Sequence, residues 1–292
     1  MTANPATTVP EAVAALDPAA LADQAGAENF PVALALLGRA AREDLRAIYG
    51  FARLVDDVGD RAPGDRIAGL DWVEAELDRA LAGDATHPVF VALGATARRI
   101  GVGREPFVDL VAANRQDQLV SRYPRYADLE AYCALSANPV GRLVLAVFGR
   151  TDARAAALSD SICTGLQLVE HWQDVGEDFA AGRVYLPVED LERFAVPEAA
   201  LGARAASPEL RRLLAFEVGR ARRLLDAGRP LVDLLGGTAR LAIAGFIGGG
   251  LAQLDAIERA GYDVLAAPVK ASKWAVARRS LRVRLGQRSG AR

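Results

Sequence analysis

The sequence predicts an all-α protein, and three observations support this. Alanine and leucine dominate a composition that is 51% hydrophobic, and both residues favour helices. Apolar residues recur every three or four positions along most of the chain. The alternation typical of β-strands never persists for more than a few residues. Because 292 residues can bury a sizeable core, we expect a single domain of eight or more helices.

Proline and glycine separate the predicted helices. Breaks fall at Pro63-Gly64, at Pro88, at Pro124, at Pro187 and at Pro268. Ser207 precedes Pro208 and is typical of a helix N-cap. The predicted helices are 31–58, 66–82, 88–100, 105–120, 126–149, 152–181, 208–234, 238–262 and 269–283.

The dipeptide Asn138-Pro139 lies inside the fifth of these helices. Proline within a helix costs ~3 kcal/mol and leaves a carbonyl one turn earlier without its partner. The pair therefore indicates either a kink that opens a cavity wall or simply a helix boundary at residue 138. The sequence leaves both interpretations open.

The charge is unevenly distributed. The net charge of −2 does not suggest a nucleic-acid binder. After Asp263, however, the chain has Lys and Arg residues but no acid. This basic segment, with Trp274, Val276 and Leu281, is either a solvated, partly disordered tail or a surface that lies on an anionic membrane.

The remaining bulk features favour a cytoplasmic protein, with contact to the inner face of the membrane if the tail binds lipid. Cys133 and Cys163 lie in apolar helical contexts without metal-type spacing, so we expect reduced core residues. The first residues have neither the basic start nor the apolar core of a signal peptide. The longest apolar stretch, residues 241–254, is too short and too glycine-rich to span a bilayer.

Two aspartate-rich stretches, LVDDVGDR and HWQDVGEDF, break local helix rules in the same way. Asp56 and Asp60 are four residues apart, as are Asp174 and Asp178, so each pair shares one helix face. A like-charge pair at this spacing costs roughly 0.2–0.5 kcal/mol, and the glycine within each stretch costs about 1 kcal/mol relative to alanine. Repeated local inconsistency is typical of functional sites, although each pair alone also fits an ordinary solvated face.

Carboxylates without nearby Cys or His ligands suit Mg²⁺ or Mn²⁺. Two such faces, opposed across a helical cavity, could hold a diphosphate through bridging metal ions. Gln167 and Glu170 extend the second face, while Arg53, Arg183 and Tyr185 lie close to the two stretches. A di-iron site needs Glu-x-x-His pairs, which neither histidine provides. The glycine runs lack a dinucleotide fingerprint.

Taken together, these stretches resemble the squalene/phytoene synthase family, whose members have the class I isoprenoid synthase fold with a central cavity. The resemblance covers residues 28–265, which leaves residues 1–27 as an N-terminal extension and 266–292 as a basic tail. The segments that carry it are ENFPVALALL, IYGFARLVDDVGD and CTGLQLVEHWQDVGEDFAAGRVYLP.

The resemblance implies a role for each candidate residue. Mg²⁺ would be bound by Asp56, Asp60, Asp174 and Asp178. Glu170 stands where the family usually has asparagine, and it would either join the metal face or repel diphosphate. The substrate-contact group would comprise Asn29, Arg53, Gln167, Arg183 and Tyr185, and the catalytic group Tyr49, Tyr132 and Asn138.

Within the family, SANPVGRLVL and LQLVEHWQDV look most like the bacterial hydroxysqualene synthase branch of squalene and hopanoid biosynthesis. That branch would convert presqualene diphosphate and water to hydroxysqualene without NAD(P)H. Two alternatives remain. The chain could condense two farnesyl or geranylgeranyl diphosphates to presqualene diphosphate or phytoene, or it could be a non-catalytic helical partner of sister enzymes at the membrane.

Overall fold

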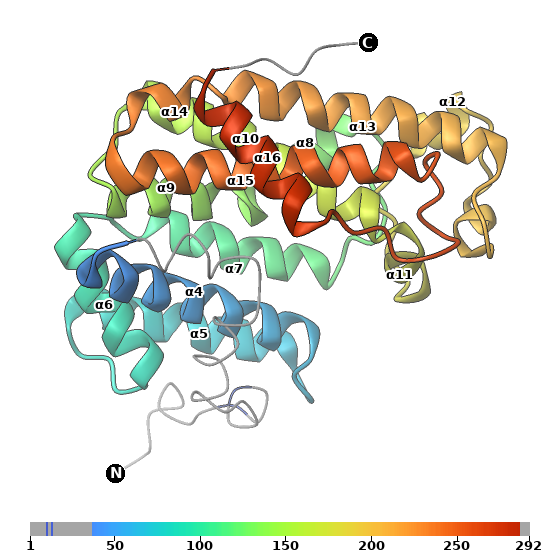
Figure 1. Cartoon of the computed structure of the whole chain (residues 1–292). Coiled ribbons are helices and arrows are strands. Elements are labelled where there is room, and N and C mark those ends of the chain that lie inside the picture. Colours follow the sequence, from blue (N-terminus) through green and yellow to red (C-terminus); the bar gives the residue numbers. More distant parts are fainter. Residues whose placement is uncertain (1–9, 11–12, 14–36, 287–292) are drawn as a thin grey trace. The chain divides into compact units, whose positions relative to one another are not determined.

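The computed structural model describes Pro10, Val13 and residues 37–286, and within this part the chain is helical and has no β-strand (Figure 1). Two predicted helices match the observed bounds, α5 (Arg66–Ala82) and α6 (Pro88–Ile100). Asp65 caps α5 because its carboxylate accepts a hydrogen bond from the Ala68 N–H at 3.0 Å. The helical composition therefore predicts the secondary structure correctly.

The chain divides into two compact units. Within the described residues, the first unit contains 37–119 and 139–151, and the second contains 120–138 and 152–286. One of the divisions falls between Asn138 and Pro139, at the start of a helix.

The first unit packs its helices around an aromatic centre. Its helices are α4 (Arg39–Asp60), α5, α6, α7 (Glu105–Asp117) and most of α9 (Asn138–Val147). Phe51 of α4 is fully buried and meets Phe90 of α6 and Phe107 of α7 edge to face, with ring centroids 5.8 and 5.5 Å apart. Leu143 of α9 joins the same core. This packing fixes α4, which carries the first aspartate stretch.

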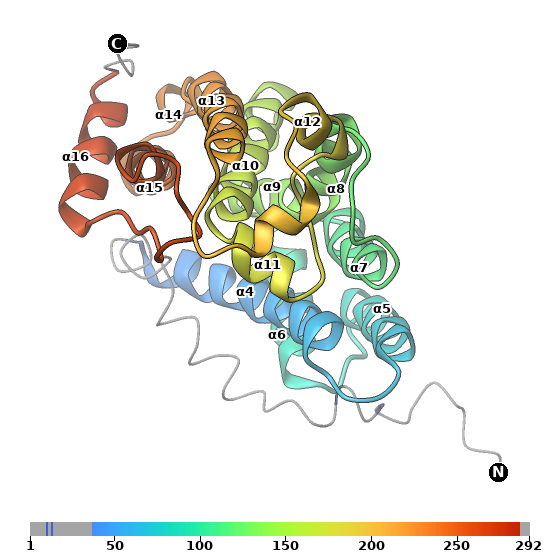
Figure 2. The ribbon, with the colours of Figure 1, turned by 90° about the vertical axis from the view of Figure 1, so that its right-hand side faces the viewer.

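The second unit is built on the long helix α10 (Ala153–Gln173). Helix α13 (Pro208–Gly228) packs on α10, and α15 (Gly237–Arg259) packs on both. The outermost helix, α16 (Lys273–Arg284), lies against α15 (Figure 2). The shorter elements are α8 (Tyr126–Ser136), α11 (Val175–Ala180), α12 (Val188–Arg193), η2 (Glu198–Gly202) and α14 (Leu231–Leu234).

Three predicted helices are wrong in length because each is interrupted. The 126–149 helix ends at Ser136, and α9 starts at Asn138, so Pro139 occupies a first turn where its missing N–H has no cost. The boundary interpretation of Asn138-Pro139 is therefore correct. The 152–181 helix breaks at Asp174, whose ψ of 16° leaves the helical region. The 208–234 helix breaks after Gly228 and resumes after Pro230.

Helix α15 alone, within the described residues, is long and apolar enough to cross a membrane by length and composition. However, 61% of its most apolar window is buried inside the protein. This burial is typical of a core helix, and it agrees with the packing of α15 against α10, α13 and α16.

Each unit contains a fully buried glutamate with different partners. In the first unit, Glu76 binds the Arg79 side chain and accepts the backbone N–H groups of Thr86 and His87 at 3.1 and 3.2 Å. Burial opposes ionisation of Glu76, but these donors outweigh it, so the pKa of Glu76 is lowered. In the second unit, Glu217 shares the cation Arg220 with Asp190, which also pairs with Arg193 at 4.0 Å, and burial raises the pKa of Glu217 to about 8.

Candidate active site

The first aspartate stretch lies at the C-terminal end of α4, where three aspartates have three different environments. Asp57 is buried and forms ion pairs with Arg53 at 2.9 Å and with Arg61 at 3.5 Å. Asp56 and Asp60 are exposed, and they lie on the helix stripe that also contains Tyr49 and Arg53. Arg53, which the sequence suggests for diphosphate binding, therefore neutralises Asp57 in this structure.

Helix α7 explains the glycine within this stretch. A Cβ atom at Gly59 would lie 2.2 Å from Oδ1 of Asn114, so only glycine allows this approach. Asn114 Nδ2 donates to Asp56 Oδ1 at 3.2 Å, and Gln118 Nε2 donates to the Gly59 carbonyl at 2.9 Å. The glycine thus lets α7 hold the Asp56 carboxylate in place.

The Asp56 carboxylate is less acidic than an isolated aspartate. Asp56 is accessible to solvent, but the surrounding protein desolvates it, and this is the main reason why its pKa is raised. The negative charge of Asp60 adds to the rise in pKa, and the hydrogen bond from Asn114 opposes it. Asp56 therefore takes up a proton at a higher pH than an ordinary aspartate does.

The second stretch does not lie on one continuous helix. Asp174 is both the last cap of α10 and the first cap of α11. The Asp178 N–H donates to the Asp174 carbonyl at 2.8 Å, and the Arg183 N–H donates to the Asp178 carbonyl at 2.8 Å. These backbone bonds bring Asp174, Asp178 and Arg183 together around α11.

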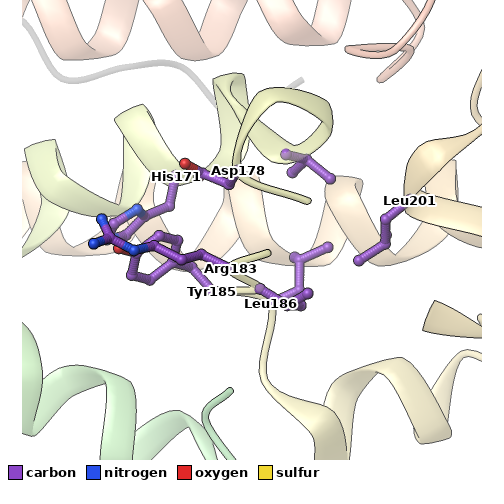
Figure 3. Close-up of a pocket in the computed structure, with 8 residues that line it drawn as sticks. His171, Asp178, Arg183, Tyr185, Leu186 and Leu201 are labelled. Carbon is purple, nitrogen blue, oxygen red and sulfur yellow. The ribbon is translucent and has the colours of Figure 1, made fainter. Parts of the chain in front are cut away.

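A small pocket opens beside α11, and Figure 3 shows its lining. His171 comes from α10, Asp178 from α11, and Arg183 and Tyr185 from the segment that follows α11. The remaining lining is apolar and comprises Val175, Val184, Leu186 and Leu201. Arg183, Tyr185 and Asp178 are sequence-predicted site residues, and the structure brings them together.

The charges of this pocket are set by burial. Burial raises the pKa of Asp178 to about 7; the negative charge of Asp174 adds to the rise and Arg183 opposes it. Burial lowers the pKa of His171 to about 3, so this imidazole is neutral at physiological pH. Gln167 Nε2 lies 3.3 Å from His171 Nε2, which orients the ring.

Tyrosine rings extend the pocket wall around His171. The imidazole stacks on Tyr185 with centroids 3.7 Å apart and planes at 15°. Tyr132 of α8 lies 6.0 Å from Tyr185 and 6.4 Å from His171, between ring centroids. Tyr123 stacks on Tyr185, with ring centroids 5.8 Å apart, and is tilted against Tyr132. The predicted catalytic Tyr132 thus belongs to a nearly uncharged aromatic wall.

The other predicted residues have separate positions. Asn138 is buried, and its Oδ1 accepts the Thr164 hydroxyl at 3.0 Å. Glu170 is exposed, whereas its neighbour His171 is buried. Asn29 lies outside the described residues.

Sequence reasoning missed His171, Asn114, Gln118 and Thr164. The sequence did contain one signal for His171, since it follows Gln167 by four residues and so shares its helix face. Asn114 and Gln118 have the same spacing on α7. Their partners Asp56 and Gly59 are 58 and 59 residues away, and that pairing depends on how the helices pack.

The aspartate stretches were compared with the ligands that a magnesium ion needs. Among residues 37–286 and the two described earlier ones, no three His, Cys, Asp or Glu side chains form a group that could hold a metal. Each stretch by itself provides two carboxylates, and in each the pKa of one aspartate is raised mainly by burial and further by its like-charged neighbour. Mg²⁺ typically takes one or two protein carboxylates and completes its shell with water and phosphate.

Comparison with known proteins agrees with this arrangement. A family model described as squalene/phytoene synthase matches residues 24–275. A hydroxysqualene synthase of Sinorhizobium fredii is 36% identical over 210 residues, which is 70% of each chain. The crystal structure of squalene synthase HpnC from Alicyclobacillus acidocaldarius is 41% identical, with a TM-score of 0.79 over 86% of this chain and 98% of that one. The chain belongs to the squalene/phytoene synthase family.

This membership confirms the predicted family, the all-α isoprenoid synthase fold and the classification as an enzyme. Other relatives of this chain in the family are named as phytoene synthases rather than hydroxysqualene synthases. A phytoene synthase of Arthrospira platensis is 31% identical over 253 residues, which is 82% of each chain. The family therefore defines the class of reaction, head-to-head prenyl chemistry, more firmly than the substrate.

Proposed function

We propose that the protein converts presqualene diphosphate and water to hydroxysqualene and releases diphosphate. The observation that carries the proposal is the pocket in which Arg183 and Asp178 lie beside the uncharged rings of His171 and Tyr185. Ionisation of this substrate needs both a charged end for diphosphate and a wall that does not react with a carbocation. The 36% identical hydroxysqualene synthase supports the choice of substrate within the family.

The charged end would bind the leaving group. The Arg183 guanidinium can donate two parallel hydrogen bonds to phosphate oxygens. Asp174 and Asp178, with Asp56 and Asp60, would hold Mg²⁺ or Mn²⁺, and Glu170 remains a candidate further ligand. When bound, the metal ion would neutralise the negative charge that develops on the departing diphosphate.

The aromatic wall would act on the carbocation. The electron pair of the breaking C–O bond leaves with diphosphate, and the cation rearranges against the rings of Tyr185 and Tyr132, whose faces attract positive charge. A neutral His171 does not repel that charge. Water then forms a new C–O bond at one carbon and loses a proton. Because no hydride is transferred, the proposal includes no NAD(P)H.

The remaining predicted residues have supporting roles in this proposal. Asn138, oriented by Thr164, would position the water molecule. Gln167 would orient His171, to which it is adjacent. Tyr49 and Arg53 would act at the diphosphate end, and Asn29 would contact substrate from the segment before α4.

A second candidate is head-to-head condensation of two farnesyl or geranylgeranyl diphosphates. The phytoene synthase relative, similar over 82% of the chain, favours it. The two candidates differ in their use of water, since condensation incorporates no water oxygen into its product.

The test is product analysis in ¹⁸O-labelled water. Purified protein with Mg²⁺ would receive presqualene, farnesyl or geranylgeranyl diphosphate separately, and products would be identified by mass spectrometry. We expect ¹⁸O-labelled hydroxysqualene from presqualene diphosphate only. The Asp178→Asn variant is the control for a contaminating activity. Consumption of farnesyl or geranylgeranyl diphosphate, with presqualene diphosphate left intact, would favour the condensation reaction instead.

A further inference from the structure

The basic C-terminal segment forms an ordered helix that is fixed to α15. Val283 of α16 is buried, and a Cβ atom at Gly248 of α15 would lie 2.5 Å from the backbone of Ser280, so the two helices meet closely. Arg279 forms two hydrogen bonds with Asp255, each 2.6 Å long. Helix α16 therefore has a defined inner face, which packs on α15, and a defined outer face on its opposite side.

The outer face of α16 exposes three large apolar side chains. Trp274, Leu281 and Leu285 are 80%, 53% and 63% exposed. Together with Arg278 they follow spacings of four, three and four residues, so they share one side of the helix. Large apolar side chains exposed together on one surface indicate an interaction site.

Basic side chains surround this apolar stripe. Lys273, Arg278, Arg282 and Arg284 are all exposed. A groove beside Trp274 is lined by Arg259, Ser272, Ala275 and Arg278 as well. Arg279 on the inner face is paired with Asp255, whereas no ion pair within the described residues involves Arg278 or Arg282. The outer face thus presents positive charge that no acidic side chain among the described residues pairs with.

We propose that the outer face of α16 docks on an anionic lipid bilayer. Trp274, Leu281 and Leu285 enter the interfacial layer, and Arg278 and Arg282 bind headgroup phosphates. Exposed tryptophan and leucine side chains beside Arg278 and Arg282 suit a surface that is apolar within and negative at its boundary. A second copy of the chain fits less well, because two such faces would bring like charges together.

Vesicle binding tests this inference on the full chain. Vesicles of phosphatidylcholine alone and of phosphatidylcholine with phosphatidylglycerol would be sedimented with the protein. We expect binding to the anionic vesicles and a blue shift of tryptophan emission, which would report on Trp274 because Trp72 and Trp172 are buried. The variants Arg278→Glu/Arg282→Glu and Leu281→Ser/Leu285→Ser should each reduce partitioning at least about tenfold.

Two controls make the outcome decisive. Arg204→Glu/Arg223→Glu changes net charge equally at exposed positions elsewhere on the second unit, and it should retain more binding than Arg278→Glu/Arg282→Glu. Activity on detergent-dispersed substrate should be unchanged in all variants, which separates this proposal from the proposed function. Equal loss in the control variant, or equal binding to neutral vesicles, would overturn it. So would self-association that Leu281→Ser/Leu285→Ser abolishes.

Discussion

In the first unit the aspartate stretch ends one unbroken helix, α4, whereas in the second unit the corresponding stretch spans the break between α10 and α11. In α4, the neighbouring helix α7 positions Asp56 through Asn114. Around α11, the backbone itself gathers Asp174, Asp178 and Arg183. Aspartates with the same Asp-x-x-x-Asp spacing are thus positioned by tertiary packing in one unit and by local backbone geometry in the other.

The largest expected effect concerns which aspartates act in the reaction. Asp56→Asn and Asp178→Asn should each reduce kcat/KM by about 100-fold or more, because each removes a carboxylate that would hold the metal ion at the proposed diphosphate end. Both variants should keep the melting temperature of the wild type. Steady-state assays of diphosphate release and thermal unfolding would measure the two quantities.

Asp57→Asn is the matched control for this prediction. Asp57 is buried and paired with Arg53, so its loss should cost roughly 2 kcal/mol of folding free energy. Its effect should therefore be mainly on stability. If Asp57→Asn reduced activity as strongly as Asp56→Asn without lowering stability, the division of roles within the stretch would be wrong.

Sequence periodicity predicted α5 and α6 to the residue, and the repeated spacing identified both aspartate stretches. It did not reveal the break at Asp174, because that break depends on the ψ angle of one residue within an otherwise helical pattern. It also missed Asn114 and His171, whose roles arise from contacts between segments distant in sequence or from burial. The roles assigned by family resemblance, such as that of Tyr49, remain predictions.

A second prediction compares the two buried glutamates. Glu76 binds one arginine and two backbone N–H groups, so Glu76→Gln should cost roughly 2 kcal/mol at pH 7. Because the folded pKa of Glu76 is lowered, its stabilisation is present above the unfolded pKa and is lost as the pH falls through the folded value. Urea unfolding at several pH values would measure this loss, which the Gln variant should not show.

A third prediction compares the two glycines. At Gly59 an added Cβ meets Asn114, so Gly59→Ala should cost roughly 1–3 kcal/mol and disturb Asp56. At Gly176 the nearest atom is a Leu265 methyl group at 3.1 Å, which can move. Gly176→Ala should therefore change stability by less than about 1 kcal/mol, since its better helix propensity offsets the contact. Equal effects at both positions would contradict the proposed role of α7.

The smallest expected effect is that of Glu217→Gln, which should not destabilise the protein as Glu76→Gln does. The folded pKa of Glu217 is raised to about 8, so the folded state holds a proton that the unfolded state loses above its ordinary pKa. Wild-type stability should therefore fall as the pH rises from about 5 to about 8.

Glu217→Gln keeps a neutral hydrogen-bonding group beside Arg220 and leaves that cation to Asp190. At pH 8 the variant should be as stable as the wild type or more stable, by about 1 kcal/mol. Urea unfolding at pH 5, 6, 7 and 8 would measure this. A variant that lost stability at pH 8 as Glu76→Gln does at pH 7 would mean that Glu217 is ionised and that both units stabilise buried carboxylates in the same way.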